Sequence, residues 1–177
     1  IFLSALPAEA VQRVASRMYE LIGVPMLTSR SFLNISLVPA NQIVHPGVMC
    51  GLFEDWEEGV VYPKPFEFYH GMTERSAELV TAMSDECQAL KRRLQELIPG
   101  LDLHLVWPMH EMIRHLYPEQ IGDNSTLRSC FTSNKTYEGL LAPMIPVDDG
   151  FVPDFRSRYL TEDLPCGLVV FKGIAEL

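Results

Sequence analysis

The feature that most constrains the fold is a long amphipathic stretch between Thr73 and Pro99. Its apolar residues recur at helical spacing: Leu79, Met83, Cys87, Leu90, Leu94, Leu97 and Ile98. Apolar residues that recur every three or four positions form one face of a helix. Thr73 suits the N-cap, and Pro99-Gly100 ends the helix. About 25 residues at 1.5 Å each span roughly 38 Å, which is typical of the central helix of a helical domain.

The first residues have the pattern of the end of an α/β domain. Ile1 to Pro7 is predicted to be a buried strand, and an amphipathic helix follows until Gly23 and Pro25. A strand followed by such a helix is typical of the last unit of an α/β domain. The chain lacks both an initiator Met and a signal peptide, so we expect it to be the C-terminal part of a longer protein.

Turn residues divide the rest of the chain. Residues 46–72, rich in Gly, Pro and aromatics, are predicted to form a packed irregular segment. Shorter helices are predicted from Pro108 to about Tyr117, and from a cap at Asp123 or Ser125 to about Thr132. Residues 143–153 contain three prolines and Gly150, which predicts a loop. Thr161 is predicted to cap the last helix.

Charge and cysteine content limit the partners and the compartment. The net charge of −9 and a pI near 5 argue against nucleic acid and anionic membranes. No apolar run approaches the ~18 residues needed to cross a bilayer. The four cysteines form no C-x-x-C pair, which favours reduced, mostly buried thiols and a cytoplasmic location. Two disulfides in a secreted protein are the alternative.

Several common catalytic motifs are missing from the sequence. There is no G-x-G-x-x-G, no G-x-x-x-x-G-K-[ST] and no G-x-S-x-G, so this chain alone is not expected to bind a dinucleotide tightly. His110 and His115 are five residues apart, about 140° around a helix, whereas a zinc-protease motif needs histidines four apart. We therefore predict no metal site.

His45 lies between the apolar pair Ile43-Val44 and Pro46. Pro46 is expected to exclude His45 from the α region. Apolar neighbours imply partial burial, which lowers the pKa of a histidine, whereas a nearby carboxylate raises that pKa. Such a histidine can be set near neutrality, as a proton shuttle requires. The alternative is a structural histidine at a turn.

Arg158 and Asp163 are predicted to flank the start of the last helix, with Arg158 in the extended segment before it and Asp163 in its first turn. This junction would direct both side chains and free backbone N–H groups toward one region. Arginine binds a carboxylate through two parallel hydrogen bonds, and Arg156 could take the same part. The alternative is a surface arginine and an acid that serves the helix dipole.

The acidic run Glu54-Asp55-Trp56-Glu57-Glu58 has two interpretations. It is either a solvated loop or the rim of a pocket that attracts a cation, with Trp56 available for a cation–π contact.

Two motifs resemble the opine dehydrogenases, the octopine and nopaline group. Asn41-Gln42-Ile43-Val44-His45-Pro46-Gly47 is similar to the N-x-x-x-H-P-G pattern of that family, although Gln42 stands where many relatives carry Pro. The run from Arg158 to Leu168 is close to R-Y-x-x-E-D-x-P-x-G-L, with Cys166 where an aromatic is common. Residues 133–139 are a weaker match. The resemblance extends from about residue 25 to the C-terminus.

The resemblance implies a mainly α fold, the helical substrate domain of a two-domain dehydrogenase. Residues 25–177 would form this domain. Residues 1–24 would be the tail of a Rossmann domain, the dinucleotide-binding domain of the same polypeptide. That domain would bind most of the cofactor, NAD(H) or NADP(H), so the fragment alone is expected to be inactive.

The resemblance also implies a reaction and roles for residues. The reaction would be the NAD(P)H-dependent reductive condensation of an α-keto acid such as pyruvate with an amino acid. His45 would donate and accept the proton at the oxygen of the keto carbon, and Asp163 would hold the other ring nitrogen. Arg158 would bind the keto-acid carboxylate, with Asn41 also in the substrate site. The acidic run weakly favours a cationic amino acid.

Two other functions remain open from the sequence. One is a related 2-hydroxyacid or glycerol-3-phosphate dehydrogenase domain, although the few cations near residues 156–158 do not favour a phosphate substrate. The other is a non-catalytic helical dimerisation or interaction module. Such a module would show a contiguous exposed apolar patch, with His45 far from Asp163.

Overall fold

The structure is a computed structural model that describes all residues, 1–177. The chain divides into two compact units. Ile1–Val38 and Glu86–Trp107 form the first unit, and Pro39–Asp85 and Pro108–Leu177 form the second. About half of the residues are helical, with few short strands, so the prediction of a mainly α fold is confirmed. None of the helices combines the length and the apolar character that a bilayer span requires.

A strand, a helix and a second strand begin the first unit. The strands β1 (Phe2–Leu3) and β2 (Leu27–Thr28) pair in parallel, and between them lie the 3₁₀ turn η1 (Ala8–Ala10) and helix α1 (Val11–Ile22). Gly23 ends α1 with a left-handed φ of 70°, which glycine adopts without strain. The predicted helix is present, but the predicted buried strand is wrong in part: β1 is only two residues long and half-buried, and Ile1 and Leu6 are exposed. The mixed pattern after Pro25 did not indicate β2.

Helix α2 (Leu33–Ser36) anchors a polar network in the first unit. Asn34 is fully buried; its Oδ1 accepts a hydrogen bond from the N–H of Leu105 at 2.8 Å, and its Nδ2 donates to Ser29 Oγ at 2.9 Å. His104 Nδ1 lies 2.5 Å from Asp102 Oδ1. His104 is therefore a hydrogen-bonded structural residue of this network.

The long helix is α4, Glu74–Leu97. Thr73 Oγ1 accepts a hydrogen bond from the N–H of Ser76 at 3.0 Å, so Thr73 is the N-cap, as predicted. The first half of α4 belongs to the second unit and the second half to the first unit. Ser84, on the first half, accepts a hydrogen bond from the N–H of Met109 at 2.8 Å and so connects α4 to the next helix of its own unit.

Helix α3 (Asn41–Leu52) corrects two predictions. His45 and Pro46 lie inside this helix, so Pro46 does not exclude His45 from the helical region, and the irregular segment begins only after Leu52. A proline removes one hydrogen bond from a helix. Burial of most of α3 compensates for that loss: an added Cβ at Gly51 would lie 2.4 Å from the backbone nitrogen of Ser76, so α3 packs closely on α4.

Helices α5 (Met109–Leu116) and α6 (Leu127–Thr132) and the 3₁₀ turn η2 (Lys135–Tyr137) follow. Both helices match the predicted ranges. Thr126 is the N-cap of α6, one residue after the predicted candidate Ser125; Thr126 and Ser129 form a reciprocal capping box.

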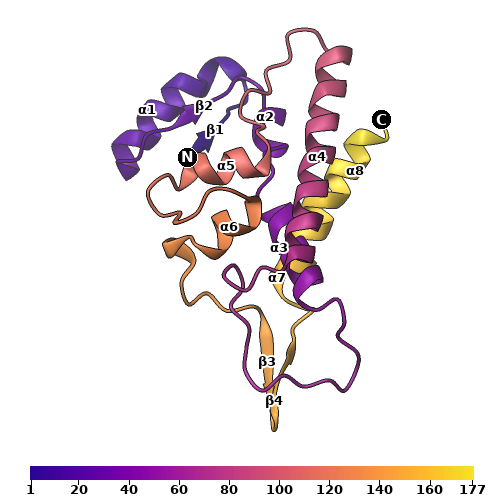
Figure 1. Cartoon of the computed structure of the whole chain (residues 1–177). Helices are drawn as coiled ribbons and strands as arrows, with labels where there is room; N and C mark the ends of the chain where they lie inside the picture. Colours follow the sequence, from indigo (N-terminus) through magenta and orange to yellow (C-terminus); the bar gives the residue numbers. More distant parts are fainter. The chain divides into compact units, whose positions relative to one another are not determined.

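Residues 143–153 form a hairpin, so the loop prediction was wrong. Strands β3 (Met144–Val147) and β4 (Gly150–Pro153) pair antiparallel around Asp148-Asp149 (Figure 1). Pro146 is tolerated because β3 is an edge strand, and Pro153 because it is the last residue of β4. Gly150 is required because an added Cβ would lie 2.2 Å from the carbonyl oxygen of Tyr62.

The chain ends in three consecutive helical segments: α7 (Arg158–Thr161), the π-helical turn η3 (Leu164–Leu168) and α8 (Val169–Ala175). Ser157, not Thr161, is the N-cap, and Arg158 lies in the first turn of α7, not in an extended segment before it. Thr161 Oγ1 donates to the carbonyl oxygen of Ser157 at 3.3 Å, so its hydroxyl is used within the helix. Helix α3 lies side by side with α7 and η3 (Figure 1).

All four cysteines are free thiols. Cys87 and Cys130 are buried, whereas Cys50 and Cys166 are exposed, so only half of them fit the prediction of buried thiols.

Candidate active site

His45 is held inside the second unit, on the fifth residue of α3, and only 6% of it is exposed. The ring of Tyr159, from α7, stacks on the imidazole with centroids 3.8 Å apart and an angle of 19°. The ring of Phe68 meets the imidazole edge-on at 5.7 Å. Aromatic rings therefore cover the imidazole and leave its two nitrogens as the groups that need polar partners.

Asp163 meets one of these nitrogens. His45 Nδ1 lies 2.7 Å from Asp163 Oδ2, although 118 residues separate the two in sequence. Asp163 stands between α7 and η3, and 17% of its side chain is exposed. A carboxylate only accepts hydrogen bonds, so Nδ1 carries a proton and donates it. In neutral His45 the lone pair is therefore on Nε2.

Tyr69 meets the other nitrogen. Its hydroxyl oxygen lies 3.0 Å from His45 Nε2. Tyr69 comes from the irregular segment between α3 and α4, so three separate parts of the sequence meet at the imidazole.

Burial has the largest effect on the charge of this group. Loss of solvent lowers the pKa of His45 below its usual value of 6.5, because the cation is the form that needs water. Asp163 opposes this effect through its hydrogen bond and its charge, and the charge of Arg158 adds to the lowering of the pKa. Burial likewise raises the pKa of the Tyr69 hydroxyl, which keeps this group protonated.

The two candidate arginines differ in their positions and contacts. Arg158 is on α7; 70% of its side chain is exposed, and Nη2 lies 3.5 Å from Glu162 Oε2. Its charge reaches His45, since it contributes to the pKa of that group. Arg156 precedes α7 and is exposed; its backbone N–H donates to Asp154 Oδ1 at 2.9 Å. An exposed pair is weak, so Arg158 is able to leave Glu162 for an anionic ligand.

Asn41 is the first residue of α3 and is exposed. It precedes His45 by four residues, a spacing that places both side chains on one face of a helix. Its position is therefore compatible with the predicted substrate contact.

The acidic run is a solvated loop. Residues 54, 55, 57 and 58 are exposed, and Glu54 pairs with Arg75 at 3.0 Å. Trp56 packs edge-on against Phe155 at 5.4 Å, and its indole N–H donates to the carbonyl oxygen of Val60 at 2.9 Å.

The aromatic contacts of His45 were not predicted from the sequence. Tyr159 belongs to the same motif as Arg158, and Phe68-Tyr69 belongs to the aromatic segment after α3. The density of aromatics was a visible signal, but nothing in the sequence assigned any one ring to His45.

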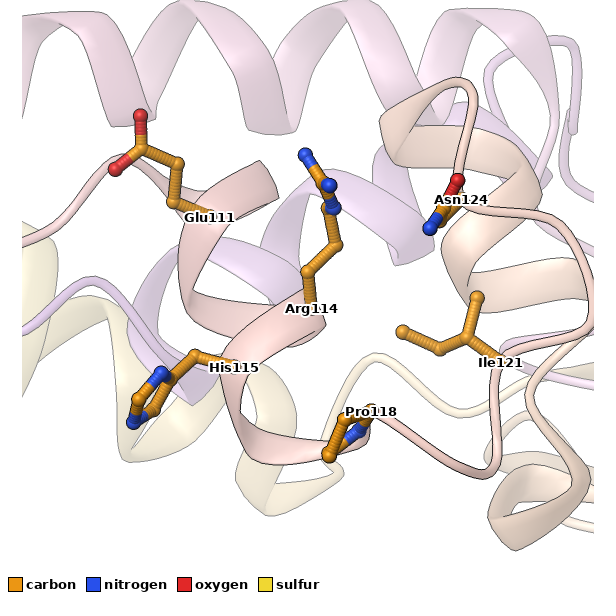
Figure 2. A pocket seen from close by; sticks show the side chains of 6 residues that line it. All are labelled: Glu111, Arg114, His115, Pro118, Ile121 and Asn124. Atoms are coloured by element: carbon orange, nitrogen blue, oxygen red, sulfur yellow. The ribbon is translucent and has the colours of Figure 1, made fainter.

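A separate hollow of about 400 Å³ lies on α5 and the loop that follows it (Figure 2). It is lined by Glu111, Arg114, His115, Pro118, Ile121 and Asn124. In this view the Arg114 side chain rises from α5 between the side chains of Glu111 and Asn124. None of the predicted site residues lines this hollow, and its charged groups have both signs, so it is not the predicted site.

A helical unit that holds a buried histidine–carboxylate pair beside an arginine is the type of site expected of a dehydrogenase substrate domain. Comparison with protein families agrees. Residues 28–177 match the model described as NAD/NADP octopine/nopaline dehydrogenase, alpha-helical domain. The chain belongs to this family, which confirms the resemblance seen in its motifs.

Three relatives have sequence identities of 36–39% to this chain. The chain is 39% identical over 147 residues to octopine dehydrogenase of Mizuhopecten yessoensis, which covers 83% of the chain and 36% of that protein. It is 38% identical over 150 residues to tauropine dehydrogenase of Arabella iricolor, covering 84% and 38%. It is 36% identical over 172 residues to opine dehydrogenase of Haliotis discus hannai, covering 97% and 41%. The chain thus spans about two fifths of the length of these relatives.

Solved structures show the same fold. Octopine dehydrogenase with NADH and L-arginine superposes with a TM-score of 0.83 at 35% identity, over 91% of this chain and 40% of that one. The structure with NADH and agmatine gives a TM-score of 0.84 at 34% identity, over 91% and 40%.

Proposed function

We propose that this chain is the substrate domain of an opine dehydrogenase, which condenses an α-keto acid such as pyruvate reductively with an amino acid. The observation that carries the proposal is the 2.7 Å contact between His45 Nδ1 and Asp163 Oδ2 in a buried site. The names of the relatives agree, since they include octopine, tauropine and opine dehydrogenases.

The proposed roles follow from the chemistry. Reduction at the keto carbon requires that its heteroatom be polarised or protonated, and a positioned acid contributes about 10²–10⁴-fold to the rate. His45 donates and accepts this proton through Nε2, the nitrogen that faces away from Asp163. Asp163 fixes the tautomer and stabilises the imidazolium, as in other histidine–aspartate pairs.

Arginine is suited to the keto-acid carboxylate because its planar guanidinium donates two parallel hydrogen bonds. We assign this role to Arg158, whose charge reaches His45, with Arg156 as the alternative. We also assign Asn41 to the substrate site, because it is exposed on the same helix as His45.

NAD(H) or NADP(H) supplies the hydride when bound. The turn between β1 and α1 has no glycine, unlike the glycine-rich turn that binds a dinucleotide in Rossmann domains. We therefore propose that a Rossmann domain of the same polypeptide binds the dinucleotide, that residues 1–24 are its tail and that residues 25–177 are the helical domain. The parallel β1–α1–β2 arrangement supports the α/β character of this tail, and its strand β2, Leu27–Thr28, extends the α/β pattern just past residue 24. Four free thiols support a cytoplasmic location.

The other functions fit less well. A non-catalytic module would not need a histidine and an aspartate in buried contact, because burial of ionisable groups is costly without a role for them. The related dehydrogenase reactions, on 2-hydroxyacids or glycerol 3-phosphate, differ in their substrate. The 2-hydroxyacid reaction is distinguished by NADH oxidation with a keto acid alone, and the few cations near residues 156–158 do not favour a phosphate substrate.

The test uses the intact polypeptide, with its dinucleotide-binding domain. NADH absorbance is followed with pyruvate and a panel of amines that includes arginine, alanine, glycine and taurine. We expect oxidation of NADH only when both pyruvate and an amine are present. Oxidation with a keto acid alone would assign the 2-hydroxyacid reaction instead, and no oxidation with any pair would refute the proposal. His45→Ala should abolish most of the turnover and leave the affinity for NADH unchanged.

A further inference from the structure

The imidazole of His45 is held at both nitrogens, and the partners at the two nitrogens differ in kind. Asp163 accepts from Nδ1 at 2.7 Å, and the Tyr69 hydroxyl lies 3.0 Å from Nε2. A carboxylate can only accept a hydrogen bond, whereas a hydroxyl can both donate and accept. The Tyr69 hydroxyl therefore donates to the lone pair of neutral His45 and accepts from Nε2–H of the cation.

Tyr69 is itself fixed by packing. Its ring stacks on Tyr137 with centroids 4.1 Å apart and an angle of 25°, and it lies nearly parallel to Phe131 at 5.8 Å. Phe68 meets it edge-on at 4.8 Å. A ring held by three aromatic neighbours has little freedom to rotate away, so its hydroxyl stays within reach of Nε2.

We propose that Tyr69 is a positioning residue for the proton chemistry of His45: in the substrate-free site its hydroxyl is the partner of Nε2 in both protonation states and stabilises the imidazolium, until the substrate heteroatom takes its place at Nε2. This inference rests on the proposed function, in which His45 is the proton donor. Tyr69 acts through His45, and no contact between Tyr69 and the substrate is required.

The expected effect has a definite direction. The groups that face His45 are Asp163, Arg158, Tyr69 and the ring of Tyr159. Hydrogen bonds to a charged group are stronger than those between neutral groups, so loss of the hydroxyl destabilises the cation more than the neutral ring. The pKa of His45, already lowered by burial, should fall further in Tyr69→Phe.

The test compares the intact wild-type polypeptide with Tyr69→Phe. The first measurement follows the His45 ring by NMR of protein labelled at histidine Cε1, and this reading does not depend on turnover. We expect the midpoint of its titration to move to lower pH by about half a unit to one unit in Tyr69→Phe. The second measurement is the pH profile of kcat/KM for NADH oxidation, which reports the free enzyme. Its high-pH limb should move by the same amount, with a loss of up to about tenfold on that limb.

Tyr137→Phe is the matched control. It removes a hydroxyl from the neighbouring ring of the same stack but none from His45, so neither the titration nor the profile should move. An unchanged His45 titration in Tyr69→Phe, or an equal shift in Tyr137→Phe, would overturn the inference. Failure of the proposed function gives a different result, namely no NADH oxidation by the wild type, and the NMR titration then still decides the role of Tyr69.

Discussion

Replacement of Asp163 by Asn is the sharpest test of the site. The change keeps the size of the side chain, but it removes the charge and offers an N–H or a carbonyl to His45 Nδ1, which lies 2.7 Å from the present carboxylate. An amide that donates to Nδ1 would move the imidazole proton to Nε2, the wrong tautomer for neutral His45. The imidazolium would also lose its counter-charge.

The size of the effect follows from the geometry. Opposite charges about 4 Å apart attract by roughly 4 kcal/mol at an effective dielectric constant of 20. Since about 1.4 kcal/mol is tenfold in rate, loss of this attraction from the transition state lowers kcat by about 10³-fold. That value falls within the 10²–10⁴-fold range of a positioned acid, so both arguments predict the same loss.

The assay is steady-state NADH oxidation by the intact polypeptide with pyruvate and its best amine. We expect kcat to fall about 10³-fold with little change in the affinity for NADH, which is measured by its fluorescence on binding. Asp148→Asn, the same change at an exposed position in the β3–β4 turn, is the control and should leave kcat unchanged. A kcat for Asp163→Asn within a few-fold of the wild type would refute the assigned role.

Three further predictions follow from the structure. The pKa of His45 is lowered in the folded state, so the unfolded chain binds more protons than the folded chain below pH 6.5. His45 therefore reduces the free energy of unfolding as the pH falls from 6.5 to its folded pKa. In urea unfolding, the stabilities of the wild type and His45→Asn should diverge in this pH window and show no pH-dependent difference above it. Arg158→Ala should raise the KM for pyruvate at least tenfold with a smaller effect on kcat, whereas Arg156→Ala should not; the reverse result would transfer the carboxylate to Arg156. Gly51→Ala should destabilise the fold by about 1–3 kcal/mol in chemical denaturation, because its Cβ would lie 2.4 Å from a backbone nitrogen of α4. The added Cβ of Gly173→Ala meets nothing within 4 Å, so this control should stabilise α8 by up to about 1 kcal/mol. Equal stabilities of the two variants would contradict this packing.

Patterns that depend on local periodicity were predictive. The apolar spacing between Thr73 and Pro99 gave α4 and its cap correctly, because a long helix with one apolar face is specified along its own length. The prediction from Pro46 was wrong, because burial and close packing of α3 on α4 outweigh the local preference of a proline. The hairpin at 143–153 was missed because its prolines are acceptable only on edge strands, and a sequence does not state which strands are edges.

The candidate site was predictable in part. His45 and Asp163 were proposed as partners on the basis of family motifs, since no local pattern joins residues that are 118 positions apart. Tyr69 has no motif of its own that points to His45, and its role depends on how the irregular segment folds over α3. Long-range contacts of this kind are set by tertiary packing, and the spacing of residues along the sequence does not predict them.

The close contact between η3 and α3 sets the geometry of the His45–Asp163 hydrogen bond. Gly167 touches the side chain of Gln42 so closely that an added Cβ would lie 2.3 Å from Gln42 Cβ. Asp163 precedes η3 by one residue, and His45 follows Gln42 by three, so this contact fixes the two helical segments that carry the acid and the base. A methyl group added at Gly167 would lengthen the hydrogen bond between Asp163 and His45 without altering either residue. The reactivity of the imidazole thus depends on packing at a buried glycine outside the histidine–carboxylate pair.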